Sequence, residues 1–199
     1  KDRILENIDY NRVIDSSDAI VLVGFPSAET PNYLIEKLNR VLPTKSLFYI
    51  LSYNVDFNKL KNEVKKAKEQ GKQIIYFSED DELNRKVIEK LEINVLLLTL
   101  NQRKDFQKQR NSGFNQVMAR TMNKNRIYLG INLDEIIEET NYKKKSEIFA
   151  RIRQNIEICN KNKVAMKFIA LKEKNKRNVY DLKSLGLVLG MPTWMTKQF

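Results

Sequence analysis

The chain has 199 residues, of which 42% are hydrophobic and 31% charged, a composition typical of a soluble globular protein with one domain spanning residues 1–199. Its 36 lysine and arginine residues outnumber 25 acidic residues, so the net charge is +11. This charge indicates a phosphate-binding surface, although a lysine-rich compositional bias explains it equally well. The longest apolar runs, residues 19–25 and 93–100, are far shorter than the roughly 20 residues of a membrane-spanning helix, which excludes a membrane-spanning protein.

Short runs rich in β-branched residues predict buried strands along the whole chain. They lie at residues 19–23, 47–51, 73–77, 94–98, 127–131 and 164–169, and a weaker strand is predicted near residues 3–8. Amphipathic helical patterns follow several of these runs, and this alternation predicts a mainly parallel sheet.

Each predicted helix has an apolar stripe that is expected to face the sheet. The stripes are Phe57, Leu60, Val64 and Ala67; Leu83, Val87 and Leu91; Phe114, Val117, Met118 and Met122; Ile148, Phe149, Ile152, Ile156 and Cys159; and Leu182, Leu185 and Leu189. Gly190 and Pro192 are expected to end the last helix. Polar, basic breaks at residues 142–145 and 172–177 are expected to be exposed loops.

The predicted fold class is α/β. Six or more strand–helix units in fewer than 200 residues fit a compact β/α barrel with short connections. An open, doubly wound parallel sheet fits the same periodicity.

Residue types that most catalytic sites need are absent. The chain has no histidine, which excludes a Ser-His-Asp triad, a histidine base and an imidazole metal site. A single cysteine excludes a thiolate zinc site and an internal disulfide, and no glycine-rich phosphate loop occurs. Cys159 shares a helical stripe with Ile152 and Ile156, so we expect a buried thiol without a role. The lack of a disulfide and of an apolar leader indicates a cytoplasmic protein.

Two carboxylate clusters are candidate Mg²⁺ ligands. Residues 79–82 (EDDE) lie at the start of a predicted helix, where acidic side chains cap the first turn, so capping is favoured over metal binding. Asp134 and Glu135, with Glu138 and Glu139, are expected to form a solvated helix face instead.

Three segments of the second half, residues 101–105 (NQRKD), 110–120 (RNSGFNQVMAR) and 125–130 (NRIYLG), are followed by the ending NVYDLKSLGLVLGM at residues 178–191. This succession resembles protein component 3 of ribonuclease P, the p-thirty-type subunit. The match spans about residues 94–191, while the first half agrees only in its order of strands and helices. Val179 and Tyr180 stand where the family has a proline and a basic residue, and nearby Arg177 is expected to compensate.

The resemblance implies a TIM-barrel-like (β/α) barrel, related to the polymerase-and-histidinol-phosphatase barrel type but without its metal ligands. It also implies a non-catalytic subunit of an endoribonuclease, one that binds the catalytic RNA and assists removal of the 5′ leader from precursor tRNA. The expected partners are the RNA, precursor tRNA, the component 2 protein and other ribonuclease P proteins. No cofactor is expected on the protein, because the Mg²⁺ ions belong to the RNA.

Basic residues in and near the matching segments are the candidate RNA contacts. They are Arg103, Lys104, Arg110, Arg120, Lys124, Arg126, Arg151, Arg153 and Arg177. Helical geometry predicts that the side chains of Arg120, Arg151 and Arg153 reach solvent. Arg103 and Lys104 follow a strand end, where barrels build functional loops, and neither is expected to be buried.

Three alternatives remain open. The loop cations could form surface salt bridges, for instance with Asp105. The chain could be a divergent phosphoesterase of the same barrel type that uses carboxylates and Mg²⁺, and metal-dependent phosphatase activity would identify it. It could also be a small-ligand-binding module, for which salt-insensitive ligand binding without RNA affinity would be diagnostic. The basic runs at residues 143–145 and 172–177 are supplementary candidates for RNA contact.

Overall fold

The computed structural model describes residues 19–24, 48–54, 57–69, 71–101, 103–107 and 109–198, the first two ranges only as strands. The weak strand predicted near residues 3–8 lies outside these ranges. Every helix within them is too short or too polar to cross a membrane.

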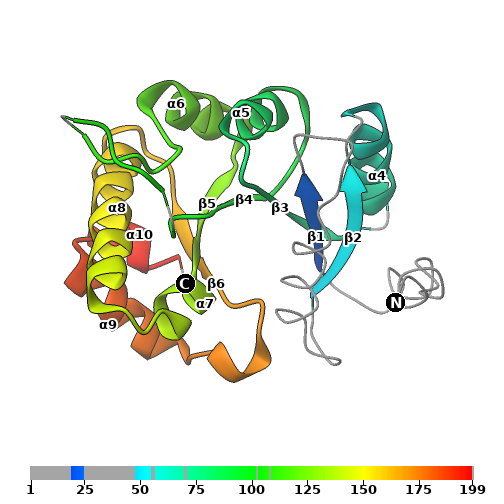
Figure 1. Cartoon of the computed structure of the whole chain (residues 1–199). Coiled ribbons are helices and arrows are strands. Elements are labelled where there is room, and N and C mark those ends of the chain that lie inside the picture. The colour runs from blue at the N-terminus through cyan, green and yellow to red at the C-terminus, as the bar shows by residue number, and fades with distance from the viewer. Residues whose placement is uncertain are drawn as a thin grey trace.

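The described strands form one parallel sheet in the order β2-β1-β3-β4-β5-β6 (Figure 1). They are β1 (Ala19–Gly24), β2 (Phe48–Asn54), β3 (Gln73–Ser78), β4 (Val95–Leu98), β5 (Tyr128–Asn132) and β6 (Met166–Ile169). Each overlaps a predicted strand, so the α/β class and the parallel sheet are confirmed.

The strand order combines features of both predicted architectures. Strands β3 to β6 follow one another across the sheet, as in a barrel, whereas β1 lies between β2 and β3, as in doubly wound sheets. Among the described strands, β2 and β6 are the outer ones. Closure into a barrel therefore stays a prediction.

Helices α4 (Phe57–Glu69), α5 (Asp81–Lys90), α6 (Gln116–Asn125) and α8 (Tyr142–Lys161) surround one side of the curved sheet (Figure 1). The remaining helices are α7 (Leu133–Glu138), the 3-10 helix η1 (Glu173–Asn175), α9 (Val179–Leu189) and α10 (Thr193–Thr196). Alternate strand residues such as Tyr76, Leu96 and Leu129 pack against these helices in one apolar core. This burial is the main force that holds the helices to the sheet.

Most of the predicted stripes are buried, but the stripe of α6 is partly wrong. Val117 is 55% exposed, and the buried residues of this helix are Met118, Ala119 and Met122. The helix begins at Gln116 because the Asn115 side chain accepts a hydrogen bond from the Met118 N–H. Val117 lies about 100° from Met118 around the helix axis, and in this helix that direction faces solvent.

One predicted loop is also wrong. Residues 142–145 form the first turn of α8, because the Asn141 side chain caps this helix by accepting from the Lys144 N–H. At the other end of the chain the prediction is confirmed: α9 stops at Gly190, which has a left-handed φ of 98°.

Candidate nucleic-acid interface

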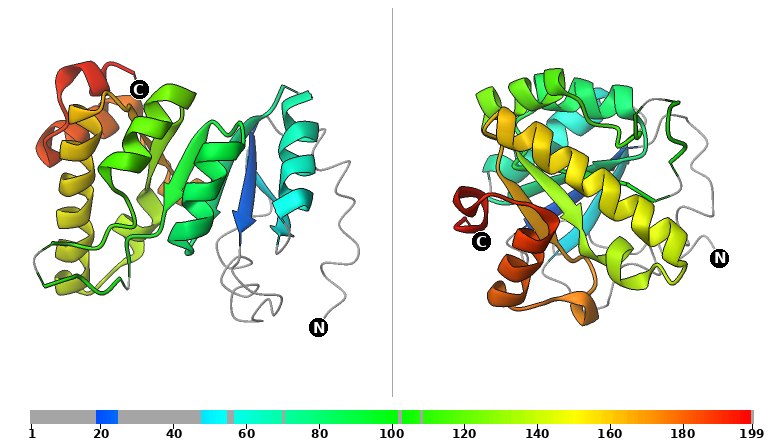
Figure 2. Two further views of the ribbon diagram at one scale, coloured as in Figure 1. Left: turned by 90° about the horizontal axis from the view of Figure 1, so that it is seen from above. Right: turned by 90° about the vertical axis from the view of Figure 1, so that its left-hand side faces the viewer.

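The connection between β4 and α6, residues 99–115, is the loop that contains Arg103, Lys104 and Arg110. It starts at the carboxyl end of a central strand, where parallel α/β sheets carry their functional loops. In both views of Figure 2 this green loop lies beside the yellow helix α8. We refer to residues 99–115 as the β4–α6 loop.

The side chain of Arg151 in α8 binds the β4–α6 loop through its guanidinium group. Its Nη1 donates to the Leu100 carbonyl at 3.0 Å, and its Nη2 donates to the Arg103 carbonyl at 2.8 Å. Its Nε and Nη2 both donate to Asp105 Oδ1, at 3.1 and 2.9 Å. The side chain is 2% exposed, so the prediction that Arg151 reaches solvent is wrong. The buried guanidinium is tolerated because loop acceptors satisfy its donors and a carboxylate balances its charge.

Arg103 is also held within the protein. Its guanidinium makes two parallel hydrogen bonds to the Asp81 carboxylate, at 3.0 and 2.9 Å, and its Nε donates to the Thr99 carbonyl. The Arg103 side chain is only 10% exposed, which corrects the expectation that it is unburied. Arg103 pairs with Asp81 of α5 and not with the nearby Asp105, whose carboxylate pairs with Arg151 and Arg110.

Asp105 organises the outer part of the loop. Its Oδ1 accepts from the Asn111 N–H at 2.9 Å, and its Oδ2 accepts from Arg110 Nη1 at 3.2 Å. Desolvation raises the pKa of this carboxyl, but the hydrogen bonds from Asn111 and Arg151 and the charges of Arg151 and Arg110 outweigh it and lower the pKa below its ordinary value. Asp105 is therefore held as an anion that closes the loop on itself.

The other candidate cations are exposed, but the structure distributes them over two edges of the sheet. Lys104 and Arg110 lie in the β4–α6 loop, and Arg177 follows β6, so all three belong to the carboxyl edge. Lys124 and Arg126 lie at the end of α6, directly before β5, and therefore belong to the opposite edge. Arg120 is exposed midway along α6, between the two edges.

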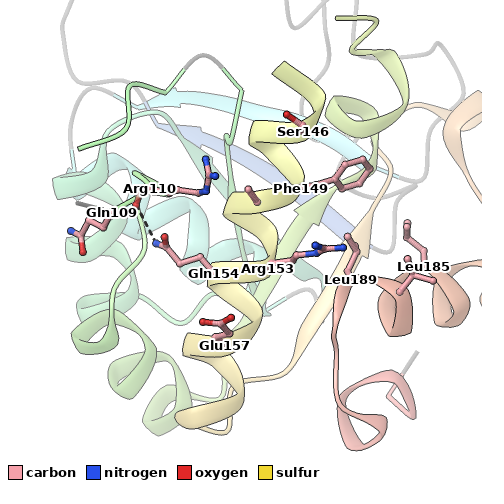
Figure 3. Close-up of a pocket in the computed structure, with 11 residues that line it drawn as sticks. Gln109, Arg110, Ser146, Phe149, Arg153, Gln154, Glu157, Leu185 and Leu189 are labelled. Atoms are coloured by element: carbon pink, nitrogen blue, oxygen red, sulfur yellow. Dashed lines mark hydrogen bonds between the residues drawn. The ribbon is translucent and has the colours of Figure 1, made fainter. Parts of the chain in front are cut away.

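Arg110 and Arg153 line one groove, which runs along α8 to α9 and has a volume of about 740 Å³ (Figure 3). Phe149, Leu185 and Leu189 supply apolar surface. Gln154 donates to the Arg110 carbonyl at 3.2 Å and so joins the β4–α6 loop to α8. Guanidinium groups beside aromatic and aliphatic surface can contact both the phosphates and the bases of single-stranded RNA.

The two carboxylate clusters have structural partners. As predicted, Asp80 caps α5, accepting from the Glu82 and Leu83 N–H groups at 2.9 and 3.2 Å. The second cluster is not a solvated face, because Asp134 is 5% exposed and accepts from the Leu171 N–H at 2.8 Å. No group of three or more potential metal-binding side chains was found in the described ranges.

The other acidic residues of the second cluster tie neighbouring segments together. Glu135 accepts from the Leu100 N–H at 3.0 Å, which fixes the start of the β4–α6 loop. Desolvation raises the pKa of Glu138, but hydrogen bonds from Lys172, Lys174 and Asn175 outweigh it, so its pKa lies below the ordinary value. The short α7 therefore connects the loops that follow β4 and β6.

Sequence reasoning named Asp81 only within the acidic cluster of residues 79–82 and Asp105 only as a possible partner of Arg103 or Lys104, and it gave Gly113 no role, so it missed how these residues anchor the β4–α6 loop. Gly113 has a left-handed φ of 68°, and a Cβ there would lie 2.4 Å from Asp81 Oδ1 and 2.5 Å from Arg103 Nη1. The ion pair thus occupies the space above this glycine. The only sequence signal was the position of Gly113 before a helix, which does not identify what packs on it.

No model of a known protein family matches the chain, and no curated protein matches it. Among solved structures, the chain is similar to one in a cryo-EM structure of archaeal ribonuclease P with mature tRNA. The TM-score is 0.59 at 17% identity, over 94% of this chain and 80% of that chain. A crystal structure of an uncharacterized protein is a weaker match, with a TM-score of 0.44 and 11% identity over 67% of this chain and 33% of the other. The chain therefore shares the fold of that archaeal ribonuclease P chain.

Proposed function

We propose that this chain is a protein subunit of ribonuclease P, of the component 3 type, which binds the catalytic RNA and assists removal of the 5′ leader from precursor tRNA. The observation that carries the proposal is the fold likeness to an archaeal ribonuclease P chain over 94% of this chain. The segment resemblance in residues 94–191 points to the same family independently of the fold. The net charge of +11 suits a phosphate-rich partner.

The exposed cations at the carboxyl edge are the best candidates for RNA contact. Lys104 is exposed, and no carboxylate pairs with it among the described residues. Arg110 keeps 46% of its side chain exposed despite its bond to Asp105, and Arg153 is exposed in the adjacent groove. The remaining exposed cations are weaker candidates for RNA contact, namely Arg120, Lys124, Arg126 and Arg177. Arg103 and Arg151 are not proposed as direct RNA contacts, because their guanidinium groups already bind Asp81, Asp105 and backbone carbonyls.

In this proposal the RNA and its Mg²⁺ ions cleave the phosphodiester, and the protein binds no cofactor of its own. Its part is to neutralise phosphates and to hold the RNA in a cleavage-competent arrangement. The component 2 protein and other ribonuclease P proteins are its proposed partners, in the cytoplasm.

Reconstitution of precursor-tRNA cleavage with the catalytic RNA, with and without this chain, tests the proposal at limiting Mg²⁺. The chain should raise the cleavage rate, and its RNA affinity should fall steeply with salt, by about 0.7 to 0.9 units of slope per phosphate contact. Lys59→Ala/Lys61→Ala is a matched control, because both lysines are exposed on α4, outside the matching segments. No stimulation, or metal-dependent phosphatase activity of the chain alone, would overturn the proposal.

A further inference from the structure

We infer that Arg151 is a positioning residue, which acts through Asp105 to hold the β4–α6 loop so that Lys104 and Arg110 face the RNA. The inference rests on the proposed RNA-binding function for its consequence. Its structural basis, a buried guanidinium that binds the loop at three residues, is independent of that function.

Arg151 is unsuited to direct contact with phosphate. Its side chain is 2% exposed, and its hydrogen bonds end on Leu100, Arg103 and Asp105. Exchanging these partners for a phosphate would leave the carbonyls of Leu100 and Arg103 without these donors and would remove the buried cation that pairs with Asp105, which is costly. An effect of Arg151 on RNA must therefore pass through the loop.

Asp105 transmits the position of Arg151 to the distal part of the loop. The oxygen that accepts from Arg151 also accepts from the Asn111 N–H at 2.9 Å, and the other oxygen accepts from Arg110. The Asp105 carboxylate thereby connects the start and the end of the segment 105–111 by hydrogen bonds. Arg110 is oriented by the same group.

Lys104 lies between two anchored neighbours. On one side, Arg103 is fixed by Asp81 of α5, and on the other, Asp105 is fixed by Arg151 of α8. Because the backbone is held on both sides of it, Lys104 presents its ammonium group to solvent from a defined position. A preorganised cation loses less conformational entropy on binding than one on a mobile loop.

The decisive experiment is a double-mutant cycle between Arg151→Met and Lys104→Ala/Arg110→Ala, read out as the affinity of the full chain for a precursor-tRNA transcript at several salt concentrations. The Lys104/Arg110 variant should lower affinity about tenfold and the salt slope by about 2. Arg151→Met should lose most of the same affinity and slope, and the combined variant should lose little more. Arg153→Met, two residues along α8 but exposed, is the matched control, because it removes a cation from the same groove as Arg110, and it should lower affinity without accelerating amide exchange at residues 100–113.

A second measurement tests the loop itself. Amide hydrogen exchange of Arg151→Met should accelerate at residues 100–113 and stay unchanged in strands β3 to β5. If Arg151→Met folds poorly, Arg151→Lys takes its place. Lysine keeps the charge but lacks the planar guanidinium, so the exchange of the loop should be intermediate between wild type and full release.

Additive losses for Arg151→Met and the Lys104/Arg110 variant would overturn the inference, as would unchanged exchange in the loop. Failure of the wild-type chain to bind RNA would instead overturn the proposed function. In that case the exchange data would still decide whether Arg151 holds the loop.

Discussion

Arg151 Nη2 lies 2.9 Å from Asp105 Oδ1, although the two residues are 46 positions apart in the sequence. This pair joins α8, the longest described helix, to the loop after β4. The basic residues of the region fall into two groups according to their burial. The side chains of Arg103 and Arg151 are largely buried and paired with carboxylates, whereas Lys104, Arg110 and Arg153 face solvent.

The adjacent residues Arg103 and Lys104 should therefore respond in opposite ways to substitution. Arg103→Ala should lower the free energy of unfolding by about 1–3 kcal/mol, because it leaves the Thr99 carbonyl and Asp81 without a donor. Lys104→Ala should change stability by less than about 0.5 kcal/mol but weaken RNA binding. Urea unfolding followed by the fluorescence of Trp194, the single tryptophan, measures the first effect. Equal stability losses in the two variants would contradict this division.

Asp105 should titrate below its ordinary pKa of 3.8, because hydrogen bonds and charges from Asn111, Arg151 and Arg110 outweigh the opposing effect of desolvation. A folded-state pKa below the unfolded one gives stability that is present above about pH 4 and lost as pH falls through the folded value. Carboxyl ¹³C NMR of the wild type measures the pKa directly, and Arg151→Met should raise it. A wild-type Asp105 that titrates at or above 3.8 would contradict the proposed role of Asp105 in holding the β4–α6 loop.

Local sequence signals predicted much of the fold. The β-branched runs fixed the strands, since a buried parallel strand needs little beyond continuous apolar residues, and Gly190 marked the end of α9. The helical spacing of apolar residues also located the buried face of α8, which contains Ile148, Ile152 and Ile156.

The partners of the basic residues could not be predicted in the same way. Arg103 pairs with Asp81 across 22 positions and Arg151 with Asp105 across 46, and no local pattern encodes such contacts. A helical wheel placed Arg151 and Arg153 symmetrically about the apolar stripe. Only the packing of the β4–α6 loop on one flank of α8 buries Arg151 and leaves Arg153 exposed.

Cys159 should be unreactive in the folded chain. It is 0% exposed, and burial raises the pKa of its thiol, so the thiolate that reacts with disulfide reagents is scarce at pH 8. Labelling should be at least about 100-fold slower in buffer than in urea, because it requires opening of α8. Rapid labelling of the folded chain, with Trp194 fluorescence unchanged, would show that this face of α8 is accessible.

Gly113 and Gly71 form a matched pair that isolates the role of the Arg103–Asp81 ion pair. Both have a left-handed backbone, with φ of 68° and 70°, so substitution by alanine should cost each about 1–2 kcal/mol in backbone strain. At Gly71 nothing lies within 4 Å of the added Cβ. At Gly113 the Cβ would lie 2.4 Å from Asp81 Oδ1 and 2.6 Å from Arg103 Nη2, so the ion pair must move. We expect Gly113→Ala to lose at least about 1 kcal/mol more than Gly71→Ala.

The same pair of variants separates stability from RNA binding. Displacement of Arg103 frees one side of Lys104, so Gly113→Ala should weaken RNA affinity, whereas Gly71→Ala, between α4 and β3, should bind like the wild type. The comparison is made well below the unfolding temperature of both variants, where each is fully folded. If the two variants lost equal stability and equal affinity, the clamp on Arg103 would have no part in presenting the loop, and Lys104 would reach RNA without it.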